Sequence, residues 1–149
     1  STQSRSSAAS DVYKRQGVFH NGDLLPPVTS IANVSNQVGV GAVGADEGSR
    51  IPPDSRLRLI KALEYANMRP RISGSVGIDL AFVAQGVYKA AVSFSPHPWD
   101  NAAGVLLARC AGAVVTDIDG NEWELGSLGV IAGSPDIHES VLRTIKRIA

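Results

Sequence analysis

The stretch of sequence that decides the fold runs from Trp99 to Gly120 and reads WDNAAGVLLARCAGAVVTDIDG. Its nearly uninterrupted apolar run, residues 102–111, predicts a helix that is buried on most of its circumference. Gly112 suits the position just after a helix, so residues 113–118 are expected to form a strand that ends in a turn. A helix that feeds directly into a strand indicates an α/β fold.

A carboxylate, Asp100, stands at the start of this helix. There it can act as the helix cap or as a first-turn carboxylate, and capping contributes about 1 kcal/mol. A carboxylate held in that place can also ligate a metal ion. The spacing alone favours capping, so the choice depends on the rest of the chain.

The remaining sequence alternates between strand and helix patterns, which predicts a layered α/β architecture. Pro52 to Ser55 signals a helix start, and apolar residues then recur at helical spacing as far as Ala66. Asn21-Gly22 signals a two-residue hairpin with a type I′ turn. Further strands are expected at 33–45, 69–73, 89–94 and 128–132, and further helices at 76–87 and 135–149.

Composition narrows the class of protein. The chain has 149 residues, of which 44% are hydrophobic and 19% charged, with a formal net charge of zero. Such a balance is typical of a globular domain and offers no electrostatic footprint for nucleic acid or an anionic membrane. The one cysteine, Cys110, excludes an intramolecular disulfide, and a buried thiol indicates a reducing, cytoplasmic compartment.

The first sixteen residues are unlike the rest. They are polar and rich in serine, and residues 6–16 can be written in codons as a transposase-type sequencing adapter read in frame. Such a scar is excluded from fold reasoning. We therefore expect a tail at 1–16, a terminal hairpin and edge segment at 17–36, and an α/β domain at 37–149.

Three motifs follow one another in order: GSVGIDLAFVAQG at 74–86, WDNAAGVLLARCAG at 99–112 and VIAGSP at 130–135. With GVFHNG at 17–22, they resemble signatures of the inositol monophosphatase family, the Mg²⁺-dependent, Li⁺-sensitive phosphatases of sugar phosphates. The resemblance spans most of residues 17–149. It implies a layered α/β sandwich, the carboxy-terminal domain of the sugar phosphatase fold, preceded by the last hairpin of the amino-terminal domain.

The resemblance implies that Asp100 is one ligand of Mg²⁺, which polarises a phosphate ester and activates water. The other ligands of the family come from a Glu-Glu pair and an Asp-Pro-Ile/Leu-Asp-Gly-Thr motif, and neither occurs in residues 17–149. One carboxylate cannot hold Mg²⁺ in an octahedral cage. We therefore expect a fragment of a phosphomonoesterase that is inactive alone, from a full-length protein that forms a homodimer.

The same resemblance also predicts which residues contact the substrate. Gly74, Ser75 and Val76 lie at a strand-to-helix junction, where free backbone N–H groups favour an anion, although Ser75 can equally be a plain helix cap. His97 matches a family histidine near the substrate, and a surface residue held between prolines is an equal alternative. Ser93 stands where inositol-specific members carry a carboxylate, which opens related substrates: histidinol phosphate, fructose bisphosphate or a nucleotide bisphosphate.

Other interpretations remain open. The chain can be a non-catalytic module that binds a polyol or sugar phosphate through Gly74 and Ser75. It can also be a folded fragment without function, which predicts an exposed apolar face where a missing half would pack. We expect Trp99 to be a packing residue, and Asp117 and Asp119 to form a turn rather than bind metal.

Overall fold

A computed structural model describes residues 17–31, 35–41 and 51–148. Its centre is a mixed five-stranded sheet with the strand order β4-β3-β5-β7-β6. β3 runs parallel to β4 and β5, whereas β7 runs antiparallel to β5 and β6. The strands are β3 (Gln37–Val40), β4 (Arg69–Arg71), β5 (Ala90–Ser93), β6 (Val114–Thr116) and β7 (Val130–Gly133).

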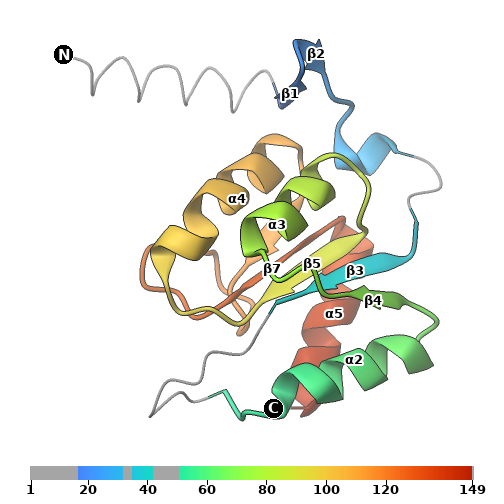
Figure 1. Cartoon of the computed structure of the whole chain (residues 1–149), viewed down its shortest axis with the longest axis vertical. Helices are drawn as coiled ribbons and strands as arrows, with labels where there is room; N and C mark the ends of the chain where they lie inside the picture. The colour runs from blue at the N-terminus through green and yellow to red at the C-terminus, as the bar shows by residue number, and fades with distance from the viewer. Residues whose placement is uncertain (1–16, 32–34, 42–50, 149) are drawn as a thin grey trace.

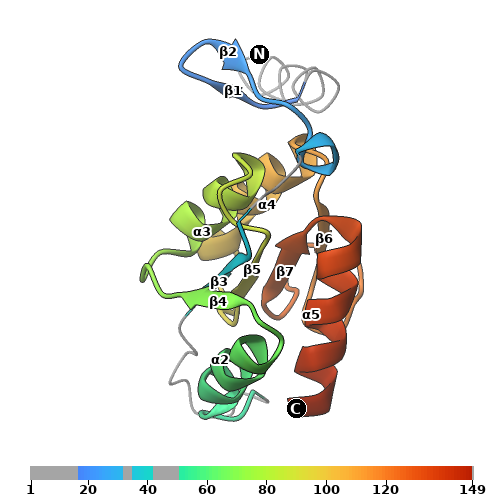
Figure 2. The same cartoon turned by 90° about the vertical axis from the view of Figure 1, so that its right-hand side faces the viewer.

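Helices cover both faces of this sheet, which confirms the layered α/β fold. α3 (Val76–Ala84) and α4 (Pro98–Cys110) lie side by side on one face, and α2 (Ser55–Tyr65) and α5 (Pro135–Ile148) lie on the other, as Figures 1 and 2 show. Each interface has its own apolar core. Leu59 and Val141 belong to the core under α2 and α5, and Leu80 and Val105 belong to the core under α3 and α4.

The topology brings the starts of α3 and α4 to one edge of the sheet. α3 follows β4 and α4 follows β5, and both strands run parallel to β3 between them. The two helices therefore run in the same direction, and both begin at the carboxyl ends of these strands (Figure 1). In open α/β sheets, ligands bind at this edge.

A close approach at Gly104 fixes how α3 and α4 pack. A Cβ atom added to Gly104 would lie 2.5 Å from Cδ1 and 2.6 Å from Cβ of Leu80, so no larger residue fits without a shift. Leu80 is fully buried. The glycine in the Ala102-Ala103-Gly104 run is thus a contact point between the helices, and it sets how closely α4 approaches α3 at Leu80.

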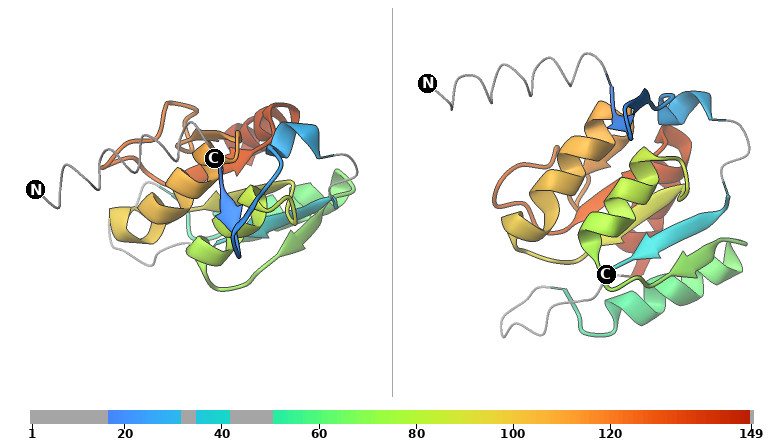
Figure 3. Two further views of the ribbon diagram at one scale, coloured as in Figure 1. Left: turned by 90° about the horizontal axis from the view of Figure 1, so that it is seen from above. Right: turned by 45° about the horizontal axis from the view of Figure 1, so that its top comes forward.

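The amino-terminal hairpin was predicted correctly. β1 (Phe19–His20) pairs with β2 (Asp23–Leu24) in a separate two-stranded sheet, which extends away from the body of the molecule in Figure 2 and is drawn over it in the view from above in Figure 3. Asn21 and Gly22 have φ angles of 51° and 85°, as a type I′ turn requires. A 3₁₀ turn, η1 (Val28–Ser30), then joins the body, because the Val28 N–H donates to the Ala111 carbonyl at 2.9 Å.

Most expected elements are present with shorter bounds. The strand expected at 33–45 is β3, and its predicted Val43 lies outside the described residues. The helix start at Pro52 to Ser55 and the helix at 135–149 are confirmed by α2 and α5. Gly112 follows α4 with a φ angle of 84°, as expected for the residue that ends a helix.

Asp100 takes the second of its two expected places. The helix begins at Pro98 with His97 at the cap position, so Asp100 is a first-turn carboxylate and not the cap. Most of the helix is buried or partly buried, as expected, but Leu106 and Leu107 are 39% and 38% exposed on one side. Cys110, expected to be a buried thiol, is only partly buried.

Apolar side chains are exposed on the sides of α3 and α4 that face away from the sheet. They include Ile78 as well as Leu106 and Leu107, and the hairpin adds exposed Phe19 and Leu24. The sequence predicts such a face where a missing half would pack. None of the helices in the described ranges is long and apolar enough to cross a membrane.

Candidate functional site at the starts of α3 and α4

Asp100 is exposed in the first turn of α4, where the helix dipole favours a carboxylate. The Ser95 hydroxyl donates a hydrogen bond of 2.6 Å to its Oδ2 atom. A bond this short to an ionised acceptor is a strong one. Asp100 is therefore held in a defined orientation at the edge of the sheet.

A buried polar network lies beneath Asp100. The Ser93 hydroxyl donates to Asn101 Oδ1 at 2.9 Å, and Asn101 Nδ2 donates to the Ser95 carbonyl at 2.9 Å. The Ser95 N–H donates in turn to the Ser93 hydroxyl at 3.2 Å. Ser93 and Asn101 are 2% and 1% exposed, so this network belongs to the interior.

The predicted substrate turn at Gly74, Ser75 and Val76 forms the second part of the edge. Gly74 has a φ angle of 81° and no atom within 4 Å of an added Cβ, so the backbone there is open to solvent. Ser75 caps α3, since its hydroxyl accepts a hydrogen bond from the Ile78 N–H at 3.3 Å. Capping by Ser75 leaves other first-turn N–H groups of α3 directed toward this edge.

Asp79 supports this turn from below, and the sequence analysis assigned it no role. It is 2% exposed, and its Oδ1 accepts a hydrogen bond of 2.8 Å from the Ser73 hydroxyl. That hydroxyl also accepts from the Ser75 N–H at 3.0 Å. Burial raises the pKa of the Asp79 carboxyl, and the Ser73 bond partly offsets the rise. A lone charged residue in the apolar run 76–87 was the signal that could have found it.

Gly39 on β3 makes room for Asp79. A Cβ atom at Gly39 would lie 2.9 Å from both Cβ and Cγ of Asp79. The carboxyl is therefore pressed against the sheet, and its Oδ2 has no hydrogen-bond partner among the residues that the structure describes. The hydrogen bond from Ser73 offsets part of the cost of burying this group, and it connects the core to the turn.

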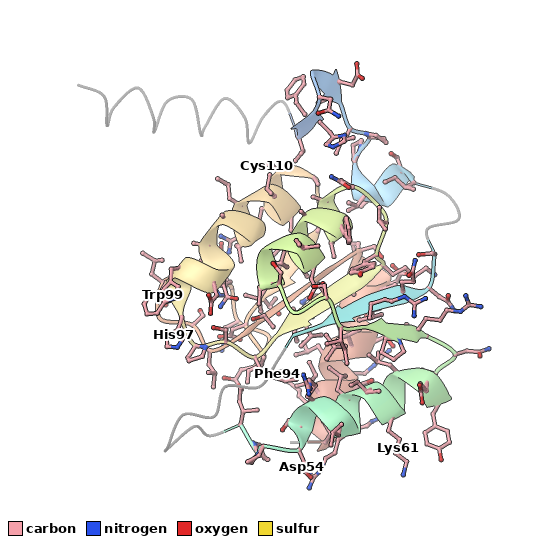
Figure 4. The ribbon with its side chains drawn as sticks, viewed as in Figure 1. Asp54, Lys61, Phe94, His97, Trp99 and Cys110 are labelled. Atoms are coloured by element: carbon pink, nitrogen blue, oxygen red, sulfur yellow. The ribbon has the colours of Figure 1, made fainter. Side chains whose placement is uncertain are left out.

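Half-buried His97 and exposed Trp99 form an aromatic pair at the start of α4 (Figure 4). Their rings stack with centroids 4.5 Å apart and an interplanar angle of 11°. Trp99 was expected to be a packing residue, and it packs on the His97 ring at the surface, with its side chain 77% exposed. The His97 N–H donates to the Ser95 hydroxyl at 3.2 Å, which ties the pair to the Asp100 contact.

The other predicted residues take structural places. The Ser93 hydroxyl points to Asn101, so a contact with substrate requires it to leave that partner. Asp117 forms the expected turn, because its Oδ1 accepts hydrogen bonds from the N–H groups of Asp119 and Asn121, both at 2.9 Å.

The donor set around Asp100 fits one contribution to a Mg²⁺ site. Mg²⁺ is bound through one or two carboxylates with water and substrate oxygens, and Asp100 is exposed and oriented by a neutral hydroxyl. No group of three or more histidine, cysteine, aspartate or glutamate residues gathers among the described residues. The described residues therefore provide one carboxylate ligand of such a site, Asp100.

The fold and this edge define a class of protein: an α/β sandwich that presents a carboxylate and a Gly-Ser turn at the starts of two adjacent helices. Comparison with known sequences agrees, because the sequence model of the inositol monophosphatase family matches residues 7–149. The chain belongs to the inositol monophosphatase family. The boundary expected at residue 17 lies within this match and stays a prediction.

Similarity to individual proteins supports the same family assignment. The chain is 41% identical over 131 residues to a probable inositol 1-monophosphatase, ImpA, of Mycobacterium tuberculosis, a match that covers 88% of this chain and 48% of that protein. It is 30% identical to a fructose-1,6-bisphosphatase/inositol-1-monophosphatase of Thermotoga maritima, again over 48% of that protein and 89% of this chain. The chain spans about half the length of the curated relatives it matches.

Solved structures agree with the fold. An inositol monophosphatase of Thermotoga maritima superposes with a TM-score of 0.73 and 26% identity, over 89% of this chain and 48% of that one. An inositol monophosphatase of Anabaena superposes with a TM-score of 0.71 and 25% identity, over 89% and 54%. The family and the matched relatives are phosphatases.

Proposed function

We propose that this chain supplies the carboxy-terminal half of a Mg²⁺-dependent phosphomonoesterase that acts on inositol phosphate or a related polyol or sugar phosphate. The observation that carries the proposal is the common edge at which the oriented Asp100 carboxylate and the open Gly74-Ser75 turn begin two adjacent helices. Family membership supports the reaction class. The names of the relatives, inositol 1-monophosphatase and fructose-1,6-bisphosphatase, support the substrate class.

Each residue of the edge has a role in this proposal. Asp100 would hold Mg²⁺, which supplies charge stabilisation of the ester and a nucleophilic water when bound. The backbone of Gly74, Ser75 and Val76 would contact substrate oxygens through N–H groups at the start of α3. His97 would border the substrate, with its ring supported by Trp99.

We further propose that the chain is inactive alone and that the full-length protein is a cytoplasmic homodimer. Residues 17–149 contain neither the Glu-Glu pair nor the Asp-Pro-x-Asp-Gly-Thr motif that the family uses for its other ligands. A single carboxylate leaves Mg²⁺ almost fully hydrated and weakly bound. The ligands must come from a second half, for which the exposed sides of α3 and α4 offer an apolar surface.

The proposal is tested by supplying an amino-terminal half to the chain. The chain is joined to the amino-terminal half of the ImpA relative, and phosphate release from inositol 1-phosphate and fructose 1,6-bisphosphate is measured with Mg²⁺. The joined protein should hydrolyse at least one of the two, and the chain alone should hydrolyse neither. Asp100→Asn should lower the rate at least about 100-fold, because even residues outside the first coordination sphere cost 10–100-fold.

Asp54→Asn is the matched control, because it makes the same chemical change on the opposite side of the sheet, where Asp54 pairs with Arg58 at 2.6 Å. It should keep full activity. Full activity in Asp100→Asn would refute the assigned role of Asp100. Binding of inositol 1-phosphate at the Gly74-Ser75 turn without hydrolysis by the joined protein would instead support a non-catalytic binding module.

A further inference from the structure

We propose that Asn101 is a positioning residue that orients the Asp100 carboxylate through Ser95. The inference concerns the orientation of Asp100, and only its link to metal binding rests on the proposed function. Asn101 does not touch the carboxylate by any bond of its own. It acts on the backbone of the residue whose hydroxyl does.

The argument begins with the place of Asn101 in α4. It is 1% exposed and shares the inward face of the helix with Gly104, Val105 and Ala108. An amide buried on an apolar face is costly unless its polar atoms are hydrogen-bonded. Both polar atoms are engaged: Oδ1 accepts from Ser93, and Nδ2 donates to the Ser95 carbonyl.

These bonds fix the backbone of Ser95 on both sides. Its carbonyl accepts from Asn101, and its N–H donates to the hydroxyl of Ser93, which Asn101 also holds. Ser93 belongs to the central strand β5, so the loop after the strand is tied to the first turn of the following helix. The backbone position of Ser95 is therefore set by the core.

A fixed backbone leaves Ser95 free to use its hydroxyl at the surface. That hydroxyl accepts from the His97 N–H at 3.2 Å, so its proton is directed to Asp100 Oδ2 at 2.6 Å. A chain of hydrogen bonds, here called the relay, therefore runs from β5 through Asn101 and Ser95 to the Asp100 carboxylate. A leucine at position 101 would fill similar space on this face and would make none of these bonds.

The experiment uses the 149-residue chain with ¹³C-labelled aspartate and ¹⁵N-labelled backbone. Asn101→Ala and the volume-matched Asn101→Leu are compared with Ser95→Ala. Hydrogen exchange of the His97 amide should accelerate about tenfold in both Asn101 variants, because the loss of a buried hydrogen bond loosens its acceptor. The Asp100 ¹³Cγ signal should shift in the same direction as in Ser95→Ala.

The double variant decides whether the effects pass through Ser95. If Asn101 acts through the serine, the Asp100 shift in Ser95→Ala combined with Asn101→Leu should equal that in Ser95→Ala alone. Thr116→Val is the matched control. It removes a buried hydroxyl that lies 2.8 Å from His138 Nε2, and it should leave the Asp100 and His97 signals unchanged.

The inference is overturned if both folded Asn101 variants leave the Asp100 signal in place, or if the Asn101 and Ser95 shifts simply add. In the joined enzyme, Asn101→Leu should raise the Mg²⁺ concentration needed for half-maximal rate about 10-fold, with the KM for substrate unchanged. A joined enzyme with no activity would refute the proposed function only, because the spectroscopic comparison decides the relay without it.

Discussion

The two helix layers of this molecule differ in what they present to the outside. α2 and α5 carry many exposed charges, and α2 also exposes Leu57 and Tyr65; the exposed charged residues include Arg58, Lys61, Glu64, Glu139, Arg143, Lys146 and Arg147. α3 has one charged residue, Asp79, and it is buried, while the outer sides of α3 and α4 expose Ile78, Leu106 and Leu107. Charged outer sides are typical of helices that face solvent. A helix that is apolar on both sides is typical of the protein interior.

This difference is clearest in α4. Its sequence is apolar on nearly every side, whereas Leu106 and Leu107 are exposed on the side that faces away from the sheet. The helix sequence thus suits an environment larger than this chain, which agrees with the half-length match to the relatives.

The largest effect should come from comparing an inward leucine of α2 with an outward leucine of α4. Leu59→Ala removes a fully buried side chain and should lower the free energy of unfolding by about 2–5 kcal/mol. Leu107→Ala should cost about 1 kcal/mol or less in this chain. Urea denaturation measures both, and equal losses would mean that the outer side of α4 is already covered, for instance by a second copy.

The next effect concerns two helical glycines in the α3 and α4 layer. Gly104→Ala should lower the free energy of unfolding by about 1–3 kcal/mol, because its Cβ would overlap Leu80. Gly77→Ala should raise it by about 0.5–1 kcal/mol, since the nearest atom to its Cβ is Ser75 Oγ at 4.0 Å and alanine favours a helix. Thermal unfolding of the two variants shows whether each substitution stabilises or destabilises the chain. A stabilising effect of Gly104→Ala would contradict the close packing of α3 and α4.

The smallest effect is a pH dependence on the α5 side. Burial lowers the pKa of His138 below its usual value of 6.5, so the folded chain binds fewer protons there than the unfolded chain. Its contribution to stability is therefore full above pH 6.5 and is lost as the pH falls from 6.5 through the lowered pKa. Urea denaturation at pH 7.5 and pH 5.5 should show a loss at low pH that is smaller in His138→Gln.

Much of the fold could be predicted because it depends on local signals. Asn21-Gly22 specifies its turn by itself, since both residues accept positive φ angles. α5 was predicted from a single apolar stripe, and Val141 and Ile145 are buried on that stripe. Neither element needs information from distant parts of the chain.

The site was harder to predict because its residues meet through tertiary contacts. The motif placed Asp100 near a helix start, but its contact with Ser95 depends on how the loop after β5 folds. Asn101 was missed because it stands just before the apolar run. Its spacing to Gly104, Val105 and Ala108 was the available signal, since these four residues share the inward face.

Pro70 has a consequence for how molecules of this protein meet one another. It lies in the edge strand β4, opposite Val38 of β3, and a proline cannot donate a backbone hydrogen bond. Arg69 and Arg71 flank it with exposed positive charges. A strand from a neighbouring molecule would meet a missing donor and like charges at this edge, so the sheet is protected against growth into a fibre on that side.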